Sequence, residues 1–399
     1  MHEVVIVEAC RTAVGSFGGT LKPMNADDLA AAVLRGALAR AQLDPAAVDE
    51  VILGHCRQSS DCSNTARCAA LSAGIPDATP ANTVMCACAS GMLAANNAVN
   101  AIRTGQEQIV LAGGTESMSN AIFYLSNARW GLGTGGAQLK DALTEAQFCA
   151  QPQDIYGRFN MGMTAENIAR QMGIGRQAQD AFALCSQQKA QAAIEAGRFR
   201  DEILPLTVPQ GKKKADVVFD TDEFPRETSM DRLAALRPVF LADGTVTAGN
   251  SSGRNDGASV LLLMREERAR ALGCRPMARV RGIAAAGVDP RVMGLGPVEA
   301  AGRVMAMTGL SLADMGLIEL NEAFAAQALG CIRALSLDDR MDIINVNGGA
   351  IALGHPIGSS GCRIMVTLVH EMMKRQTPLG LATLCIAGGM GMAAVLELV

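Results

Sequence analysis

The chain has 399 residues, of which 49% are hydrophobic and 19% charged, and its formal net charge is -4. This length permits two or three domains or one large layered unit, and the composition argues against extensive disorder. The weakly acidic balance gives no general affinity for nucleic acid or for an anionic membrane. The chain also lacks the run of about 20 apolar residues that a transmembrane span needs.

Twelve cysteines in a chain of this length are not the pattern of a small disulfide-stabilised secreted protein. The N-terminal segment HEVVIVEA is typical of an apolar strand and has neither the basic region nor the separate hydrophobic region of a signal peptide. We therefore expect reduced thiols and a cytoplasmic location.

Strand-like and helix-like segments alternate in the first third of the chain. Apolar runs at 4–9, 48–54 and 108–114 predict buried strands, and the periodicity at 26–41 and 90–102 predicts helices. Later, 379–384 is again typical of a strand. This alternation predicts mainly parallel α/β layers.

The middle of the chain, from about 120 to 248, differs in composition. It is rich in irregular and charged sequence, with one helical stretch predicted at Ala165–Ala196 and a basic run, Lys212–Lys214, that we expect to be a solvated loop. The pattern predicts an inserted, loop-rich lobe of the kind that carries binding specificity on a rigid scaffold. A Gly/Ser/Asn-rich turn at 244–258 then leads into another strand.

The pattern of residues 43–54 recurs at 310–321, 267 residues later, and the same offset places Cys88 opposite His355. We interpret this as two copies of one α/β unit, each contributing a catalytic loop to a shared cleft. The alternative is chance similarity between two βα units.

Cys88 lies where a strand-like segment meets a helix that begins near Ser90. A helix N-terminus lowers the pKa of a thiol and supplies free N–H donors, so this position suits a nucleophile. The alternative is a small buried apolar residue, which is the usual role of a free cysteine. Cys86, two residues earlier, is expected to have that role.

His355 stands between Gly354 and Pro356 in a glycine-rich loop, which suits a catalytic base better than a helix interior would. The other histidines are weaker candidates for a catalytic base, because we expect His2 and His370 to lie at the surface and His55 to be structural. A structural role for His355 is the alternative.

Cys385 opens CIAGGMG, whose glycines permit close approach and positive φ values. Asn321 follows the apolar run LIEL, and its amide could orient a water or a carbonyl oxygen. A helix N-cap is the alternative role for Asn321.

The chain resembles the thiolase family, on its acetyl-CoA acetyltransferase and 3-ketoacyl-CoA thiolase branch, along its whole length. Seven motifs carry the resemblance: CASGM at 88–92, GGTESMS at 113–119, MGMTAEN at 161–167, GTVTAGNSSGRNDGA at 244–258, NEAFAAQ at 321–327, NGGAIALGHPIGSSG at 347–361 and CIAGGMG at 385–391.

The resemblance implies a five-layered αβαβα fold of two similar halves, assembled as a homodimer or homotetramer. The N-terminal half would cover 1–120, completed by about 249–270, and the C-terminal half would cover 271–399. Residues 121–248 would form a loop domain over the active site.

The resemblance also implies catalytic roles. Cys88 would be the acylated nucleophile, His355 its base, and Cys385 the acid/base that moves the α-proton of acetyl-CoA. Asn321 and His355 would hold a water as one oxyanion hole. The N–H groups of Cys88 and Ala387 would form the other, since an enolate oxygen needs such donors.

The family pattern further implies a set of positions around CoA. They are Ser252, Arg226, Met161, Asn160, Phe240, Ala248, Met293, Ala323 and Phe324. Asn160 replaces a histidine usual in the acetoacetyl-CoA type, which removes one pantetheine-side contact. Ala387 replaces a customary glycine, so a positive φ would be disfavoured there.

These features predict thiolysis of a 3-ketoacyl-CoA, or the reverse Claisen condensation, through an acyl enzyme without a metal or cofactor beyond CoA as substrate. Acetoacetyl-CoA is the expected substrate. A thiolase for longer, branched or dicarboxylic chains is the alternative, since 148–159 looks longer than usual. A less favoured alternative is a non-catalytic acyl-CoA-binding or lipid-binding relative.

Overall fold

A ten-stranded mixed sheet organises the protein in the computed structural model, which describes residues 2–211 and 215–399. The expected Lys212–Lys214 loop lies outside the described residues. Along the sheet the strand order is β12-β13-β14-β11-β1-β10-β5-β3-β4, and β2 pairs with β10. Strands β1 to β5 and β10 form one side of this sheet, and β11 to β14 form the other.

The first half-sheet contains β1 (Val4–Arg11), β3 (Glu50–Gly54), β4 (Ala81–Val84), β5 (Ile109–Ser117) and β10 (Asn255–Arg265). Strands β3, β4 and β5 are parallel, whereas β10 runs antiparallel to both β5 and β1. Strand β10 enters from far along the chain, after the inserted middle segment.

The second half-sheet repeats this arrangement with β11 (Ala278–Gly287), β12 (Leu317–Leu320), β13 (Leu379–Ile386) and β14 (Met390–Leu398). Strands β12 and β13 are parallel, and β14 is antiparallel to β13 and β11. Two residue pairs between β1 and β11 join the halves edge to edge.

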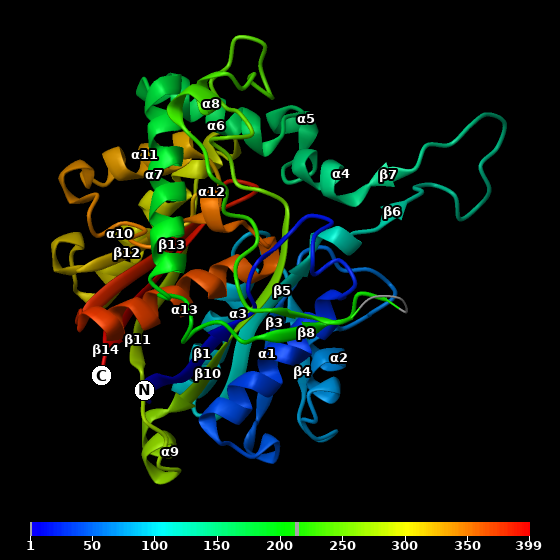
Figure 1. Ribbon diagram of the computed structural model, residues 1–399. Helices are drawn as coiled ribbons and strands as arrows, with labels where there is room; N and C mark the ends of the chain where they lie inside the picture. The colour runs from blue at the N-terminus through cyan, green and yellow to red at the C-terminus, as the bar shows by residue number, and fades with distance from the viewer. Residues whose placement is uncertain (1, 212–214) are drawn as a thin grey trace.

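Helices divide the molecule into five layers (Figure 1). Helices α1 (Ala26–Ala41) and α2 (Thr65–Ser72) pack in one hydrophobic cluster with the first half-sheet. Helices α3 (Ser90–Thr104) and α13 (Ile357–Arg375) pack together in the central cluster, which draws side chains from both half-sheets.

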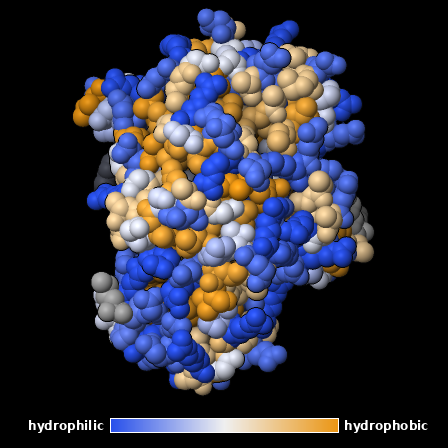
Figure 2. All heavy atoms as spheres, turned by 90° about the vertical axis from the view of Figure 1, so that its left-hand side faces the viewer, coloured by the Kyte–Doolittle hydropathy of each residue, from blue (hydrophilic) through white to orange (hydrophobic). Residues whose placement is uncertain are grey.

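On the far side, α10 (Gly296–Thr308) and α11 (Ala325–Ala334) pack with the second half-sheet. Figure 2 views the molecule from this side, where hydrophilic side chains surround smaller hydrophobic groups. The predicted α/β layering and its two similar halves are therefore present.

Strand β1 shows why the sheet is buried on both faces. Val5 and Val7 join the cluster beneath α1, whereas Val4 and Ile6 join the central cluster. Successive side chains of a strand point to opposite faces, so a continuous apolar run suits a strand covered on both sides.

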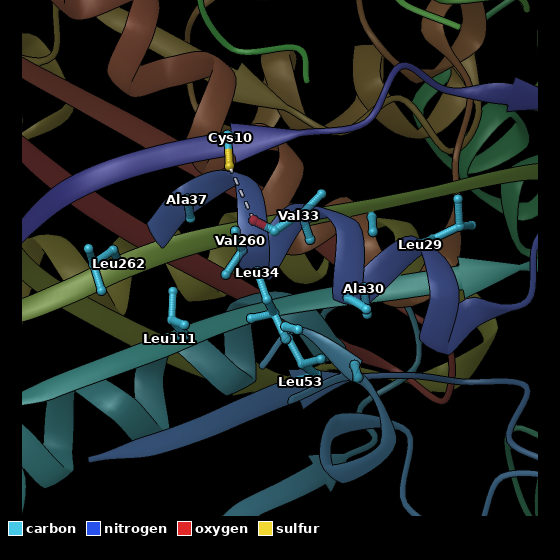
Figure 3. Packing of buried hydrophobic residues seen from close by; sticks show 14 of the residues in the cluster. Cys10, Leu29, Ala30, Val33, Leu34, Ala37, Leu53, Leu111, Val260 and Leu262 are labelled. Carbon is cyan, nitrogen blue, oxygen red and sulfur yellow. Dashed lines mark hydrogen bonds between the residues drawn. The ribbon is translucent and has the colours of Figure 1, made fainter. Parts of the chain in front are cut away.

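Helix α1 has the boundaries that its sequence predicts. Asn25 and Asp28 form a capping box at its start. Figure 3 shows Leu34 on the buried side of this helix near Leu111 of β5. The same view shows the hydrogen bond that the Sγ of Cys10 donates to the Val33 carbonyl oxygen (3.7 Å). The apolar residues of α1 recur with the helical period, so they lie on one face of the helix, and that face packs against the sheet.

The middle segment forms two longer helices and several short elements. They are β6 (Phe123–Tyr124), β7 (Lys140–Asp141), α4 (Ala142–Phe148), α5 (Gln153–Tyr156), α6 (Met161–Met172), α7 (Arg176–Glu195), β8 (Leu206–Val208), β9 (Val217–Phe219) and α8 (Met230–Ala234). The single predicted helix at Ala165–Ala196 is wrong: α6 and α7 are separate because Gly173 adopts a φ of 62° and ends α6.

The remaining elements are β2 (Gly15–Ser16), α9 (Glu266–Ala271) and α12 (Ala350–Leu353). Among the helices of the described residues, none combines the length and apolar character that crossing a membrane requires.

Candidate active site

Cys88 and His355 occupy equivalent places at the ends of two packed helices. Cys88 precedes the first residue of α3 by two positions, and His355 precedes that of α13 by two. The two helix starts touch: a Cβ at Gly91 would lie 3.0 Å from the Gly358 carbonyl oxygen. Only glycine permits this approach, which brings the two loops to the same end of the central layer.

The turn that presents Cys88 has a strained backbone, which the sequence did not reveal. Ala87 adopts a φ of 42°, a left-handed conformation that costs a residue with a Cβ about 1 kcal/mol or more. Its carbonyl oxygen accepts from the Sγ of Cys56 (3.0 Å) and from the Oγ of Ser90 (2.7 Å). Ser90 also accepts from the N–H of Cys86 (2.8 Å), so surrounding hydrogen bonds fix the turn.

The Cys88 thiol is protonated in the free protein. Burial raises its pKa to about 11, although the backbone N–H of Ala387 and the charge of Arg57 act to lower it. The expectation that the helix N-terminus lowers this pKa is therefore wrong, because desolvation of the thiolate outweighs the nearby donors. A protonated thiol needs a base before it can act as a nucleophile.

His355 has the properties of such a base. Its backbone N–H donates to the Oδ1 of Asn255 (2.9 Å), and its Nδ1 lies 2.7 Å from the Oγ of Ser360. Its Nε2 is buried and has no hydrogen-bond partner among the described residues. Burial and the charge of Arg363 lower the pKa of His355 to about 4, so the imidazole is neutral at pH 7.

Cys385 is the next-to-last residue of β13 and lies near the first thiol. It is fully buried, and this burial raises the pKa of its thiol well above the ordinary value. The negative charge that Cys88 can carry is a second, smaller cause of the rise. The positive φ values of this loop fall on Gly388 (94°) and Gly389 (88°), and Ala387 is not among the described residues with positive φ. The expected conflict at Ala387 is therefore absent, because the glycines make the turn.

Asn321 lies beside the same strand end. It follows β12, and its backbone N–H donates to the Thr383 carbonyl oxygen (3.0 Å). Its side chain is buried, and within the described ranges neither amide atom has a hydrogen-bond partner. The N-cap of α11 is Phe324, so the capping alternative for Asn321 is wrong. A buried amide without partners is a natural site for a water or a substrate oxygen.

Apolar side chains from three segments surround Cys385. Met293 and Ala323 form a buried cluster with it, and Met161 and Phe324 pack against that cluster. The rings of Phe240 and Phe324 meet edge to face with centroids 6.3 Å apart. Five of the positions expected around CoA therefore form one apolar wall.

The more polar expected positions are held by local hydrogen bonds. The N–H of Ser252 donates to the Ala323 carbonyl oxygen (3.0 Å), and the Nη2 of Arg226 donates to the Ala248 carbonyl oxygen (3.1 Å). Asn160 instead caps α6, accepting from the N–H of Met163 (3.0 Å). Its side chain therefore has a structural role that the sequence analysis did not assign.

Glu116 connects the loops and was missed as a functional position. Its carboxylate is buried and accepts from the N–H groups of Cys56 (3.2 Å), Arg57 (3.0 Å) and Gly358 (2.9 Å). Burial acts to raise its pKa, but hydrogen bonds and nearby charge, first from His55, hold that pKa below the usual value. A glutamate in the GGTESMS motif, within the fully buried strand β5, was the available signal.

His55 and His370 both have buried hydrogen-bond contacts away from the thiols. His55 lies 3.4 Å from the Glu116 carboxylate, and its Nδ1 lies 2.8 Å from the Oγ of Thr65. The expectation that His370 is at the surface is wrong: it is buried on α13, and its Nε2 lies 2.7 Å from the Ala9 carbonyl oxygen. The described residues contain no group of three or more His, Cys, Asp or Glu side chains placed to hold a metal ion.

Comparison with known proteins gives consistent relatives. The chain is 51% identical over 397 residues to an acetyl-CoA acetyltransferase of Pseudomonas aeruginosa, covering 99% of each chain. It is 48% identical over 398 residues to an acetyl-CoA acetyltransferase of Cupriavidus necator, covering 100% of each.

Solved structures agree with these sequences. The Bacillus anthracis acetyl-CoA acetyltransferase superposes with a TM-score of 0.96 at 45% identity, covering 100% of this chain and 99% of that one. Human mitochondrial 3-ketoacyl-CoA thiolase in complex with CoA gives a TM-score of 0.94 at 41% identity, covering 100% and 98%.

Family models match nearly the whole sequence. The thiolase N-terminal domain matches residues 4–267, and the thiolase C-terminal domain matches residues 274–398. Together with the two thiols, the imidazole and the buried amide that the fold brings to one end of its central layer, these matches show that the chain belongs to the thiolase family.

Proposed function

We propose that the protein is an acetyl-CoA C-acetyltransferase, which forms or cleaves acetoacetyl-CoA through an acyl group on Cys88. The arrangement at Cys88 carries this proposal: the nearby N–H of Ala387 acts to lower the pKa of its thiol, and the Cys385 thiol lies within electrostatic reach. A nucleophile, an anion-stabilising donor and a second proton carrier are what Claisen chemistry on thioesters requires.

In the first half of thiolysis, Cys88 attacks the keto carbon of the 3-ketoacyl-CoA as His355 takes its proton at Nε2. The bond between the keto carbon and the α-carbon then breaks. The leaving acetyl-CoA enolate takes the proton of Cys385 at its α-carbon. The N–H donors and the amide of Asn321 stabilise negative charge on the two reacting oxygens.

In the second half, the Cys385 thiolate removes the proton of an incoming CoA thiol, which attacks the acyl group on Cys88. The Cys88 sulfur leaves and recovers its proton from His355. Condensation is the reverse sequence, and both directions are ping-pong reactions. The proposed chemistry uses only these side chains, with CoA as a substrate.

We place the nucleotide end of CoA at the outer surface near Arg226. A cavity of about 640 Å³ lies there, lined in part by Gln187, Gln191, Arg226 and Thr228. A guanidinium suits phosphate oxygens, and glutamine side chains suit the edges of a base. The pantetheine would then run along Ser252 towards the apolar wall around Phe324.

Residues 121–248 are proposed to act as the loop domain over this site. They supply Met161, Phe240 and Arg226. They also contact the loop that follows Cys385: a Cβ added at Gly388 would lie 2.8 Å from the carbonyl oxygen of Ala150. The segment before α5 therefore covers the loop that carries Cys385. This cover favours a short acyl group over the longer, branched or dicarboxylic chains of the alternative.

A substrate series tests the function. Acetoacetyl-CoA should give the highest kcat/KM for thiolysis, and kcat/KM should fall as the 3-ketoacyl chain lengthens, by about tenfold or more per pair of methylenes that the pocket excludes. A maximum at a longer or carboxylate-ended chain would support the alternative thiolase. No turnover of any 3-ketoacyl-CoA would support the non-catalytic relative.

The rate of acylation should be independent of pH across the neutral range. His355, with a pKa near 4, is an unprotonated base above that pH, and Cys88, with a pKa near 11, keeps its proton below that pH. The reactive neutral pair thus exists at every pH from about 6 to 9. Single-turnover acylation by acetyl-CoA measures this. A steep limb near pH 6.5, the ordinary histidine value, would contradict the proposed protonation states.

We propose a homo-oligomer, either a dimer or a tetramer. The arm between β6 and β7 projects from the body (Figure 1) and carries exposed Phe123, Leu132, Leu139 and Trp130, the last 94% exposed. A projecting group of apolar side chains favours burial against another protein surface, here a second copy. Sedimentation of the purified chain measures the number of copies.

A cytoplasmic location is also proposed. All twelve cysteines, each of which the structure describes, are free thiols. Cys88 and Cys385 must stay reduced for the proposed chemistry, which a reducing compartment ensures.

A further inference from the structure

Ser360 lies directly behind the proposed base. It is fully buried on the first turn of α13. Its Oγ lies 2.7 Å from the Nδ1 of His355, and the same Oγ donates to the Pro356 carbonyl oxygen at 2.9 Å. The hydroxyl therefore contacts two groups but carries only one proton.

Two proton arrangements satisfy these contacts unequally. In the first arrangement, Ser360 donates to Nδ1, so no proton lies between its Oγ and the Pro356 oxygen. His355 must then carry its own proton on Nε2. That atom is buried and has no acceptor within residues 2–211 and 215–399. If Ser360 donates to Pro356, it accepts the Nδ1 proton and every proton has an acceptor. The second arrangement leaves only a lone pair, at Nε2, without a partner.

We propose that Ser360 is a positioning residue that holds His355 in the Nδ1-protonated tautomer, so that the Nε2 lone pair is available to take the Cys88 proton. This inference rests on the proposed function of His355. Asn255 fixes the backbone of His355 through its N–H, and Ser360 fixes the ring, so both position and tautomer are set before substrate binds.

The tautomer has a direct consequence for rate. A ring free to adopt the other tautomer would present an N–H to the thiol and be unable to accept its proton. Ser360→Ala should therefore lower the acylation rate constant with acetyl-CoA about tenfold to a hundredfold, the order expected when a hydrogen bond that orients a reactive imidazole is lost. The KM for acetyl-CoA should change little, since Ser360 is not among the positions expected to contact CoA.

The neighbouring serine supplies a matched control. Ser359 is also buried on α13, but its Oγ lies 2.8 Å from the Oγ of Ser259 and has no contact with the imidazole. Ser359→Ala should lose a comparable buried hydroxyl and keep the wild-type acylation rate. Equal acylation rates for Ser360→Ala and Ser359→Ala would overturn the inference.

A spectroscopic measurement reads the tautomer itself. With ¹⁵N-labelled histidine, the wild-type spectrum should show His355 protonated at Nδ1 and unprotonated at Nε2, and Ser360→Ala should shift the population towards the opposite form. His355→Gln assigns the resonance. A wild-type His355 protonated at Nε2 would overturn the inference even if Ser360→Ala does not fold.

The same measurements separate this inference from the proposed function. Wild-type protein that is not acylated by acetyl-CoA would contradict the function, whatever the tautomer. Acylation of the wild type together with the Nε2-protonated tautomer would contradict the role of Ser360 and proton transfer at Nε2, but not the acetyltransferase function. Ser360→Thr keeps the hydroxyl and should keep the wild-type tautomer if the variant folds.

Discussion

Cys88→Ala is expected to abolish acyl-enzyme formation and to lower thiolysis at least about 10⁴-fold, because the proposed mechanism carries the acyl group on the Cys88 sulfur alone. Incubation with radiolabelled acetyl-CoA followed by denaturation measures the label that stays bound to protein. The wild type should retain about one label per chain and the variant none.

Cys86→Ala is the matched control for this change. Cys86 is a half-buried thiol on the same turn, two residues before Cys88. This variant should be acylated as the wild type is, apart from a small loss of stability. Label retained by Cys88→Ala at the wild-type level would remove Cys88 from the role of nucleophile.

Cys385→Ala should separate the two halves of the reaction. Acylation of Cys88 by acetyl-CoA should remain, because His355 supplies the base for that step. Condensation and thiolysis should fall by about 10²- to 10⁴-fold, the contribution typical of a general acid or base, because nothing else moves the α-proton. Labelling measures the first step, and acetoacetyl-CoA formation measures the second.

Cys331→Ala controls for the removal of a buried thiol near this position. Cys331 is buried on α11 within electrostatic reach of Cys385, and its Sγ donates to the Gly294 carbonyl oxygen (3.1 Å). Its loss leaves a small cavity but removes no proposed proton carrier. Condensation by Cys385→Ala at the rate of Cys331→Ala would contradict the proposed role of Cys385.

Local sequence signals predicted the elements that carry the site. The apolar period of 26–41 predicted the bounds of α1, and the helix predicted to begin near Ser90 is α3, whose first residue is Ser90. The 267-residue offset between Cys88 and His355 is preserved as the same position before two helices. These signals depend on residues close together in the chain, so they can be recognised in a single sequence.

Two local features were not anticipated from the sequence. The stretch 165–196 is predicted as one helix, but the left-handed backbone of Gly173 ends α6 within it. Asn160 was assessed only as a missing CoA contact, whereas it caps that same helix. In each case one residue at a helix end makes a hydrogen bond with a backbone group that has no partner inside the helix. The pattern of apolar residues does not show such bonds.

By itself, the sequence determined the layered α/β class, the family resemblance and the identity of Cys88, His355, Cys385 and Asn321 as candidates. Only the tertiary structure decided their protonation states and partners. A helix N-terminus favours a thiolate, yet burial by distant segments keeps Cys88 a thiol, and His355 is neutral for the same reason. Desolvation depends on all the surrounding segments together, whereas motifs and capping depend on a few neighbours in the chain.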